Sequence, residues 1–267
     1  MASRRSRYAL RTIALAYLGI LVLLPLGMIV SKVAGDGWQR FVDAVTSEAA
    51  LTAYRLTAEV SLIAVVLNTL FGVGLALLLA RYRFRGGRLL STLTDLPVSV
   101  SPIVVGLALV LVYGPVDGWF GKSLANAGIH VIYSLPGMAL ATTFVSLPLV
   151  LREVLPVLQE EGTEMEQAAK VLGASAWQQF VRITLPTIRP ALAYGVVLSL
   201  ARSLGEFGAV RVVSGGISGA GQTQTVTLLI EDKYTQLEDG TYQLALVLVA
   251  VTIAAIAVTS LRRKERV

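Results

Sequence analysis

The sequence predicts an all-α membrane protein with six transmembrane helices. Of its 267 residues, 55% are hydrophobic and only 15% are charged, and the mean hydropathy is +0.70. The apolar residues gather in runs of about 18 residues or more, which is the length that crosses a bilayer as a helix. No linker or change of composition separates a soluble part, so residues 1–267 are expected to form a single transmembrane domain.

The apolar runs fix the order of the predicted spans. The spans cover residues 12–31, 57–80, 89–113, 135–155, 188–210 and 242–261. The first follows a basic start and is too long for the apolar core of a signal peptide, so we interpret it as a retained span. Pro97 and Pro102 interrupt the first half of the third span. Apart from these prolines, the sequence shows no sign of paired broken helices and no tandem repeat.

Composition excludes several classes of function. The chain has no cysteine and a single histidine, His130, so it offers no disulfide framework, thiolate nucleophile or histidine-rich metal site. No catalytic constellation is visible, and no cofactor is expected. The net charge of +6 belongs to the segments that flank the spans, so we expect no nucleic-acid partner.

The basic residues also predict the orientation. Sixteen of the 23 Lys and Arg residues lie in four segments on one side of the predicted spans: the N-terminal tail, the turn after the second span, the 159–187 loop with its flanks, and the C-terminus. Six lie on the other side, and Arg202 lies within the fifth span. The positive-inside rule therefore places both termini and the 159–187 loop in the cytosol.

The 159–187 loop contains a polar, helix-prone segment from Glu164 to Pro186. Small and apolar residues at helical spacing form one narrow face of its first half: Met165, Ala168, Ala169 and Leu172. Gly173 can take the left-handed conformation that ends a helix, and Ser175 can cap the next one. Pro186 and Pro190 are expected to stop or kink that second helix. The loop is predicted to be a helix–turn–helix that a cytosolic partner can hold in a groove.

The same loop resembles the Glu-Ala-Ala loop of permease subunits in binding-protein-dependent ABC importers. Ala168-Ala169, Gly173, Ile183 and Leu185-Pro186 are in register, whereas Gln167 stands where the family usually has Glu. The resemblance implies coupling helices that dock on an ABC ATPase dimer. The alternative is a surface hairpin with no partner. The resemblance assigns this contact to Glu166, Gln167, Ala168, Ala169, Gly173, Ile183, Leu185 and Pro186.

The fifth span carries two ionisable residues, Arg202 and Glu206. A charge in the centre of a bilayer costs about 2.5 to 3.5 kcal/mol on insertion scales, so both should face protein or water. Their i,i+4 spacing predicts an ion pair along one helix face. The guanidinium could offer an anion its planar donors while Glu206 holds it in place. Alternatively, the pair only fastens the span to its neighbours.

The segment around this pair resembles the sulfate and molybdate subfamily of these permeases, and most of all the W-type sulfate/thiosulfate subunit. Arg202–Val210, Asp95-Leu96-Pro97 and Leu135-Pro136-Gly137 carry the likeness. It implies the fold of a type I ABC importer permease and a pathway shared with a second, T-type permease subunit. It also implies an extracytoplasmic sulfate-binding protein as a partner. The pathway residues that follow from it are Asp95, Pro102, Arg202, Gly205, Glu206 and Phe207.

Two other functions remain open from the sequence: a molybdate or tungstate permease of the same machine, and an ion-coupled secondary carrier. The chain itself is not expected to be an enzyme. Gly216–Thr223 matches the spacing of a phosphate-binding loop, but Gln222 replaces its obligatory Lys, so ATP hydrolysis is expected on a separate subunit.

Overall fold

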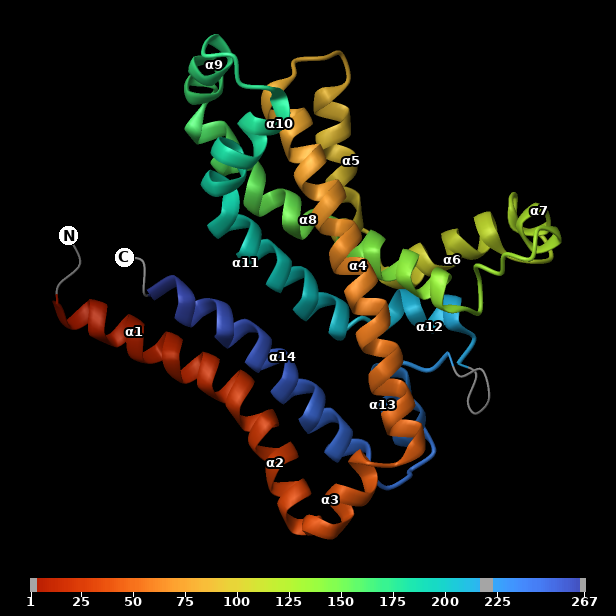
Figure 1. The fold of residues 1–267 in the computed structure, drawn as a ribbon. Coiled ribbons are helices and arrows are strands. Elements are labelled where there is room, and N and C mark those ends of the chain that lie inside the picture. Colours follow the sequence, from red (N-terminus) through yellow and green to blue (C-terminus); the bar gives the residue numbers. More distant parts are fainter. Residues whose placement is uncertain (1–3, 217–222, 265–267) are drawn as a thin grey trace.

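The computed structural model describes residues 4–216 and 223–264, and this part of the chain contains helices and no strand (Figure 1). The first half of the chain contains α1 (Arg4–Leu18), the π-helical segment η1 (Gly19–Leu23), α2 (Leu24–Asp36), α3 (Trp38–Val45), α4 (Glu48–Arg81), α5 (Gly87–Ser99), α6 (Pro102–Tyr113) and α7 (Gly121–Asn126). The second half contains α8 (Leu135–Glu161), α9 (Glu164–Val171), α10 (Ala176–Gln179), the π-helical segment η2 (Phe180–Thr184), α11 (Leu185–Leu204), α12 (Gly208–Ser214), α13 (Val226–Thr235) and α14 (Thr241–Lys264).

Three long helices, α4, α8 and α11, form the centre of the molecule. They approach closely because glycines face Val150 of α8 from both neighbours. A Cβ atom on Gly72 of α4 would lie 3.0 Å from the Val150 Cβ, and one on Gly195 of α11 would lie 3.0 Å from the Val150 Cα. Small residues at such contacts let helices in a membrane gain dispersion energy that a lipid cannot match.

A buried polar cluster lies between the same three helices. The Nδ2 of Asn68 donates to the Oγ of Ser146 at 2.7 Å and to the Oγ of Ser199 at 3.3 Å. All three side chains are fully buried. Hydrogen bonds of this kind fasten helices together inside a bilayer.

Four of the described helical stretches are long and apolar enough to cross a membrane, or five if one sharply bent pair counts as a single span. The four are residues 10–36, 48–81, 135–161 and 176–204. The predicted spans 12–31, 57–80 and 135–155 each lie within one of them. The sixth predicted span lies in α14, whose apolar described part, Thr241–Ala257, is shorter.

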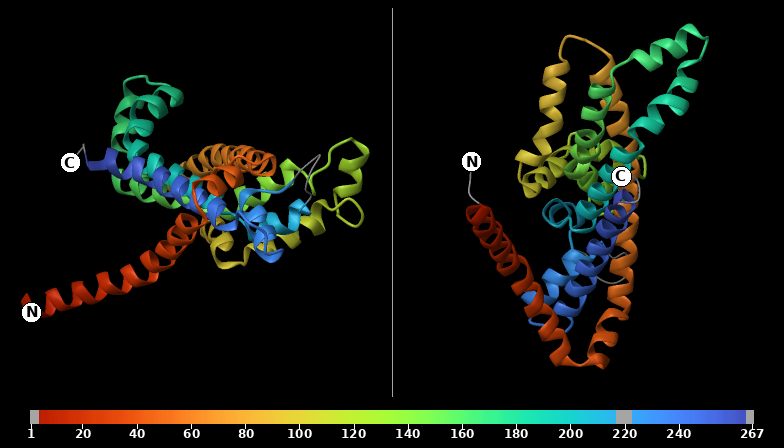
Figure 2. Two further views of the ribbon diagram at one scale, coloured as in Figure 1. Left: turned by 90° about the horizontal axis from the view of Figure 1, so that it is seen from below. Right: turned by 90° about the vertical axis from the view of Figure 1, so that its left-hand side faces the viewer.

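The first of these stretches diverges from the bundle. Helix α1 points away from the other helices in both views of Figure 2, and the most apolar 18-residue window within residues 10–36 has no buried residue. The chain returns through α3, and α2 contacts α14 near that end. The α9–α10 segment lies at the opposite end of α4 from α3 and α13 (Figure 1).

The third span is broken before Pro102, as the sequence predicts, but not at Pro97. Helices α5 and α6 meet at an angle of 112° across Val100, which is extended, and Ser101, which is also not helical. A residue before proline is pushed out of the helical region, and Pro102 has no N–H to continue the ladder. Pro102 therefore starts a new helix, whereas Pro97 lies inside α5 without ending it.

The fifth span also differs from its prediction. The helix runs without a stop from Ala176 through Pro186 and Pro190 to Leu204, so the prediction that these prolines stop it is wrong. The π-helical η2 ends two residues before Pro186, just as η1 does before Pro25. A π turn shifts the carbonyl that the proline ring would otherwise strike. The break comes instead at 205–207, inside the predicted span 188–210, and gives the structure a second broken helix that the sequence did not indicate.

Candidate functional site

The residues Glu164–Gln179, here called the α9–α10 hairpin, form the turn that the sequence predicts. Gly173 has φ +85°, a left-handed conformation that favours glycine. The Oγ of Ser175 accepts from the backbone N–H of Gln178, and the Gln178 side chain accepts from the backbone N–H of Ser175. This reciprocal capping box fixes where the second helix begins.

The tip of the hairpin is strongly apolar and exposed. Val171 and Leu172 are each 88% exposed, and Trp177 is exposed beside them. Gln167 and Ala168 are exposed as well, while Ala169 is half-buried. Large apolar side chains clustered on a surface mark an interaction site more often than an idle one. The hairpin therefore offers a contact surface that nothing within the described chain covers.

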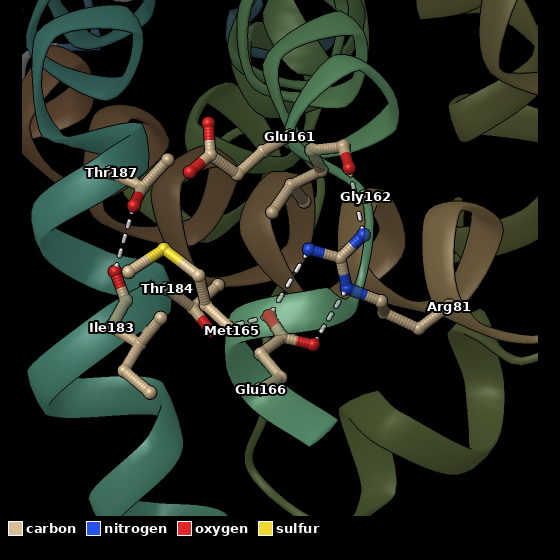
Figure 3. Close-up of a pocket in the computed structure, with 9 residues that line it drawn as sticks. Arg81, Glu161, Gly162, Met165, Glu166, Ile183, Thr184 and Thr187 are labelled. Atoms are coloured by element: carbon tan, nitrogen blue, oxygen red, sulfur yellow. Dashed lines mark hydrogen bonds and ion pairs between the residues drawn. The ribbon is translucent and has the colours of Figure 1, made fainter. Parts of the chain in front are cut away.

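Glu166 does not belong to that exposed surface. Its carboxylate accepts from the Nε and Nη2 of Arg81 at 2.9 and 3.1 Å, and from the Oγ1 of Thr184 at 2.8 Å (Figure 3). Arg81 also donates from Nη1 to the carbonyl oxygen of Leu158 at 2.7 Å. The sequence presented Arg81 only as part of a basic turn. Residues 81 and 166 are so far apart in the chain that no local pattern pairs them.

The remaining predicted residues of this loop lie on the second helix. Ile183 lines the small space beside Glu166, which has a volume of about 10 Å³ and so has room for about one water molecule. Leu185 is half-buried against the core cluster of α4 and α8, and Pro186 is exposed. Of the predicted contact residues, then, Gln167, Ala168, Gly173 and Pro186 are open to a partner.

The predicted pair of Arg202 and Glu206 forms, although not on one helix. The Nη1 of Arg202 lies 2.7 Å from the Oε2 of Glu206, but α11 ends at Leu204 and Glu206 follows in the break. The Glu206 side chain is 2% exposed and that of Arg202 is 37% exposed. The other carboxylate oxygen, Oε1, accepts from the N–H of Ala209 at 3.0 Å. Glu206 is thus the buried anchor of the pair, and Arg202 is its accessible member.

The two broken helices meet beside this pair. A Cβ on Gly208, the first residue of α12, would lie 3.1 Å from the Pro102 Cβ at the start of α6. A Cβ on Gly106 would come within 2.8 Å of the Ala209 carbonyl oxygen, so only glycine lets α6 pack so close to α12. Phe207 lies exposed in the break. The structure therefore brings Pro102, Glu206 and Phe207 to one joint, with Arg202 at its edge.

The structure gives less support to two other predicted pathway residues, Gly205 and Asp95. Gly205 lies at the end of α11 with φ −93°, an ordinary conformation that does not require glycine. Asp95 of α5 accepts from the Nε and Nη2 of Arg152 at 3.0 and 2.8 Å, and both side chains are about half-exposed. The described contacts of the Asp95 carboxylate go to α8 rather than to Arg202 or Glu206. Asp95 therefore ties α5 to α8.

Metal-binding groups and a phosphate-binding loop are the remaining features to locate in the structure. No group of three His, Cys, Asp or Glu side chains gathers there to hold a metal ion. The phosphate-loop-like spacing at 216–223 falls largely on residues 217–222, which lie outside the described part of the chain. What the geometry defines instead is a multi-pass bundle with a charged joint and an exposed apolar hairpin at one end.

This chain belongs to the family of binding-protein-dependent transport system inner membrane components, whose model matches residues 72–264. It is a multi-pass membrane permease subunit of an ABC transporter. Within that family it is a permease of the sulfate type. Membership of this family excludes the alternative of an ion-coupled secondary carrier. It confirms the prediction of an ABC permease subunit.

Relatives in several organisms support that placement. The chain is 44% identical over 254 residues to the sulfate transport system permease protein CysW of Synechococcus elongatus, covering 95% of this chain and 88% of that one. It is 44% identical over 214 residues to CysW of Escherichia coli, covering 79% and 72% of the two chains. The sulfate transport system permease protein CysT of Escherichia coli is 39% identical over 242 residues, which cover 91% and 85%.

The fold agrees with solved importers. A bacterial ABC transporter that imports the acidic polysaccharide alginate superposes with a TM-score of 0.77 at 18% identity, covering 97% of this chain and 95% of that one. A complex of a bacterial alginate ABC transporter with its pentasaccharide-bound periplasmic protein gives a TM-score of 0.76 at 19% identity, covering 94% and 91%. The likeness confirms an all-helical importer-permease fold.

Proposed function

We propose that this chain forms, with a second permease subunit of the T type, the pathway by which sulfate or thiosulfate enters the cell. The names of the relatives support the cargo, because both W-type and T-type sulfate permeases are 39% identical or more to this chain. The observation within the molecule that carries the proposal is the half-exposed Arg202 beside a buried Glu206. This places a permanent cation at a break in a membrane helix.

Arg202 suits a small oxyanion for a chemical reason. Its guanidinium presents five N–H donors in a planar fork, and the contact to Glu206 is made through Nη1. The carboxylate keeps the cation in place and lowers the cost of holding it in the membrane. Within the described residues the remaining donors make no hydrogen bond, so these donors can meet a tetrahedral anion as it passes. Pro102, Gly205 and Phe207 shape the joint around that position, and Asp95 holds α5 in place through Arg152.

The energy comes from a separate ABC ATPase dimer that binds the α9–α10 hairpin. Val171, Leu172 and Trp177 supply apolar contact area, and Gln167, Ala168 and Gly173 allow close approach. Both termini and the hairpin lie in the cytosol, as the distribution of basic residues indicates. Closure of the ATPase pair on ATP moves the hairpin, and an extracytoplasmic sulfate-binding protein delivers the anion on the other side.

Discrimination between oxyanions rests largely on that binding protein. One arginine fork cannot separate tetrahedral anions that differ mainly in size. Uptake of labelled sulfate tests the proposal. The cells lack their own sulfate permeases and express this chain with its second permease subunit, ATPase and binding protein. We expect unlabelled thiosulfate to reduce the uptake of labelled sulfate, and we expect unlabelled molybdate to leave it unchanged. Uptake of molybdate alone would assign the chain to the molybdate and tungstate permeases.

A further inference from the structure

The cytosolic end of α4 is joined to the α9–α10 hairpin by an unusually complete ionic contact. Arg81 is the last residue of α4, and its guanidinium meets both oxygens of the Glu166 carboxylate while its third nitrogen holds the Leu158 carbonyl (Figure 3). The side chains are only 12% and 19% exposed. Two parallel N–H···O bonds fix orientation as well as distance, and arginine alone provides this geometry.

This contact is the hydrogen-bonded side-chain link between α9 and α4 within the described residues. None of the eight residues of α9 is buried, and none belongs to the apolar core clusters. Thr184 of η2 adds a hydrogen bond to the same carboxylate. Glu166 therefore collects contacts from three sides, while the faces of α9 around it stay open to a partner. The second helix of the hairpin continues through η2 into α11, so the Arg81 contact adds a link from the hairpin to α4.

Helix α4 leads from this contact to the polar cluster at the centre of the bundle. Asn68 lies 13 positions before Arg81 on the same unbroken helix, roughly 20 Å along its axis. There it donates to Ser146 of α8 and Ser199 of α11. Ser199 lies one turn before Ser203 and Arg202 on α11. A continuous series of packed and hydrogen-bonded elements thus connects Glu166 with the joint that holds Arg202.

Building on the proposed function, we propose that Arg81 and Glu166 form a strut that transmits movement of the ATPase-bound hairpin into the transmembrane bundle. Neither residue contacts the anion. Glu166 is a positioning residue that acts through Arg81, rather than a contact for the ATPase. In this proposal the carboxylate of Glu166 links the hairpin to α4. The link explains how a hairpin with no buried residue can move that helix.

The test measures transport and ATP hydrolysis together in proteoliposomes that contain the whole assembly. Glu166→Gln and Arg81→Gln each leave one partner of a shielded pair uncompensated. We expect ATP hydrolysis to continue while the sulfate taken up per ATP falls about fivefold or more. The charge-reversed variant R81E/E166R should recover part of that ratio. Arg182→Gln removes a positive charge from the exposed face of η2 and is the matched control, with an unchanged ratio.

A second readout separates the strut from the choice of cargo. Because the chain has no cysteine, Phe207→Cys introduces a single thiol at the joint. Its rate of labelling by a hydrophilic thiol reagent should change on addition of ATP without any anion, and Glu166→Gln should abolish that change. An ATP-dependent change that persists in the Glu166→Gln background would overturn the strut. If the unmodified assembly takes up no sulfate, while the labelling of Phe207→Cys still changes with ATP, only the proposed cargo would be overturned.

Discussion

The Nη1 of Arg202 lies 2.7 Å from the Oε2 of Glu206 across the end of helix α11. Arg202 lies in the last turn of that helix, whereas Glu206 lies beyond it and accepts a hydrogen bond from the N–H of Ala209 in the first turn of α12. The pair therefore joins two helical segments as well as two charges. Its buried member, Glu206, also accepts a hydrogen bond from Thr227 at its backbone carbonyl.

Removing Arg202 alone should be more harmful than removing both charges. Arg202→Ala removes the cation that pairs with the buried Glu206, and breaking a buried pair in this way costs about 3 to 5 kcal/mol. The double variant, Arg202→Ala with Glu206→Gln, keeps a side-chain oxygen that accepts the hydrogen bond from the Ala209 N–H, and it leaves no buried carboxylate without a cation. Thermal unfolding in detergent should show a larger loss for the single variant. Equal losses would mean that the two residues do not act as a unit.

The hairpin turn should tolerate asparagine at position 173 but not aspartate. Gly173 has φ +85° and open space around it, so conformation rather than volume limits the substitution. Asparagine enters the left-handed region more readily than most residues, and it adds no charge to the docking surface. Gly173→Asp should insert normally but lose sulfate uptake, whereas Gly173→Asn should keep most of it. Immunoblots of membrane fractions provide the control for insertion, and full uptake by Gly173→Asp would contradict the docking role.

Two glycines of α4 provide a matched test of helix packing. A Cβ at Gly72 meets Val150 at 3.0 Å, whereas one at Gly74 has nothing within 4 Å. Gly72→Ala should destabilise the bundle by about 1 to 3 kcal/mol because the contact is overpacked. Gly74→Ala should be neutral or slightly stabilising, since alanine favours the helix. Melting temperatures of the two variants in the same detergent compare them directly; a similar fall in both would contradict the packing described.

The orientation can be tested with single cysteines, because the natural sequence has none. Leu172 at the tip of the hairpin and Trp119 in the 114–133 loop are both highly exposed. With Leu172→Cys, an impermeant thiol reagent should label only inside-out vesicles. With Trp119→Cys, it should label intact cells or right-side-out vesicles. The reverse pattern would place the hairpin outside and remove the basis for ATPase docking.

Local signals in the sequence predicted local structure well. The turn at Gly173 and the capping box at Ser175 follow from short-range chemistry, and the pairing of Arg202 with Glu206 follows from their spacing. The break before Pro102 also follows from the sequence, whereas the break after Leu204 does not, and prolines do not all act alike. Pro102 begins a helix after a residue that is not helical, whereas Pro186 and Pro190 lie within one that η2 has adjusted.

Contacts between distant segments were the least predictable. Glu166 appeared from its neighbours to be a surface residue, yet it is bound by Arg81, which is 85 positions earlier. Asp95 appeared to be an intramembrane carboxylate of the pathway, yet Arg152 holds it. These pairs form only when α9 folds back against the end of α4 and α5 packs against α8. Asn68, a polar residue within an apolar span, is a sequence feature from which the central polar cluster could have been predicted.

Anion-dependent ATP hydrolysis by the purified assembly in lipid tests the proposed function most directly. The assembly contains this chain, its second permease subunit, the ATPase and the binding protein, and sulfate, thiosulfate and molybdate are compared with no anion. We predict that binding protein loaded with sulfate or thiosulfate stimulates hydrolysis, and that the stimulation is lost in Gly173→Asp. Stimulation by molybdate alone, or hydrolysis that no anion changes, would contradict a sulfate importer.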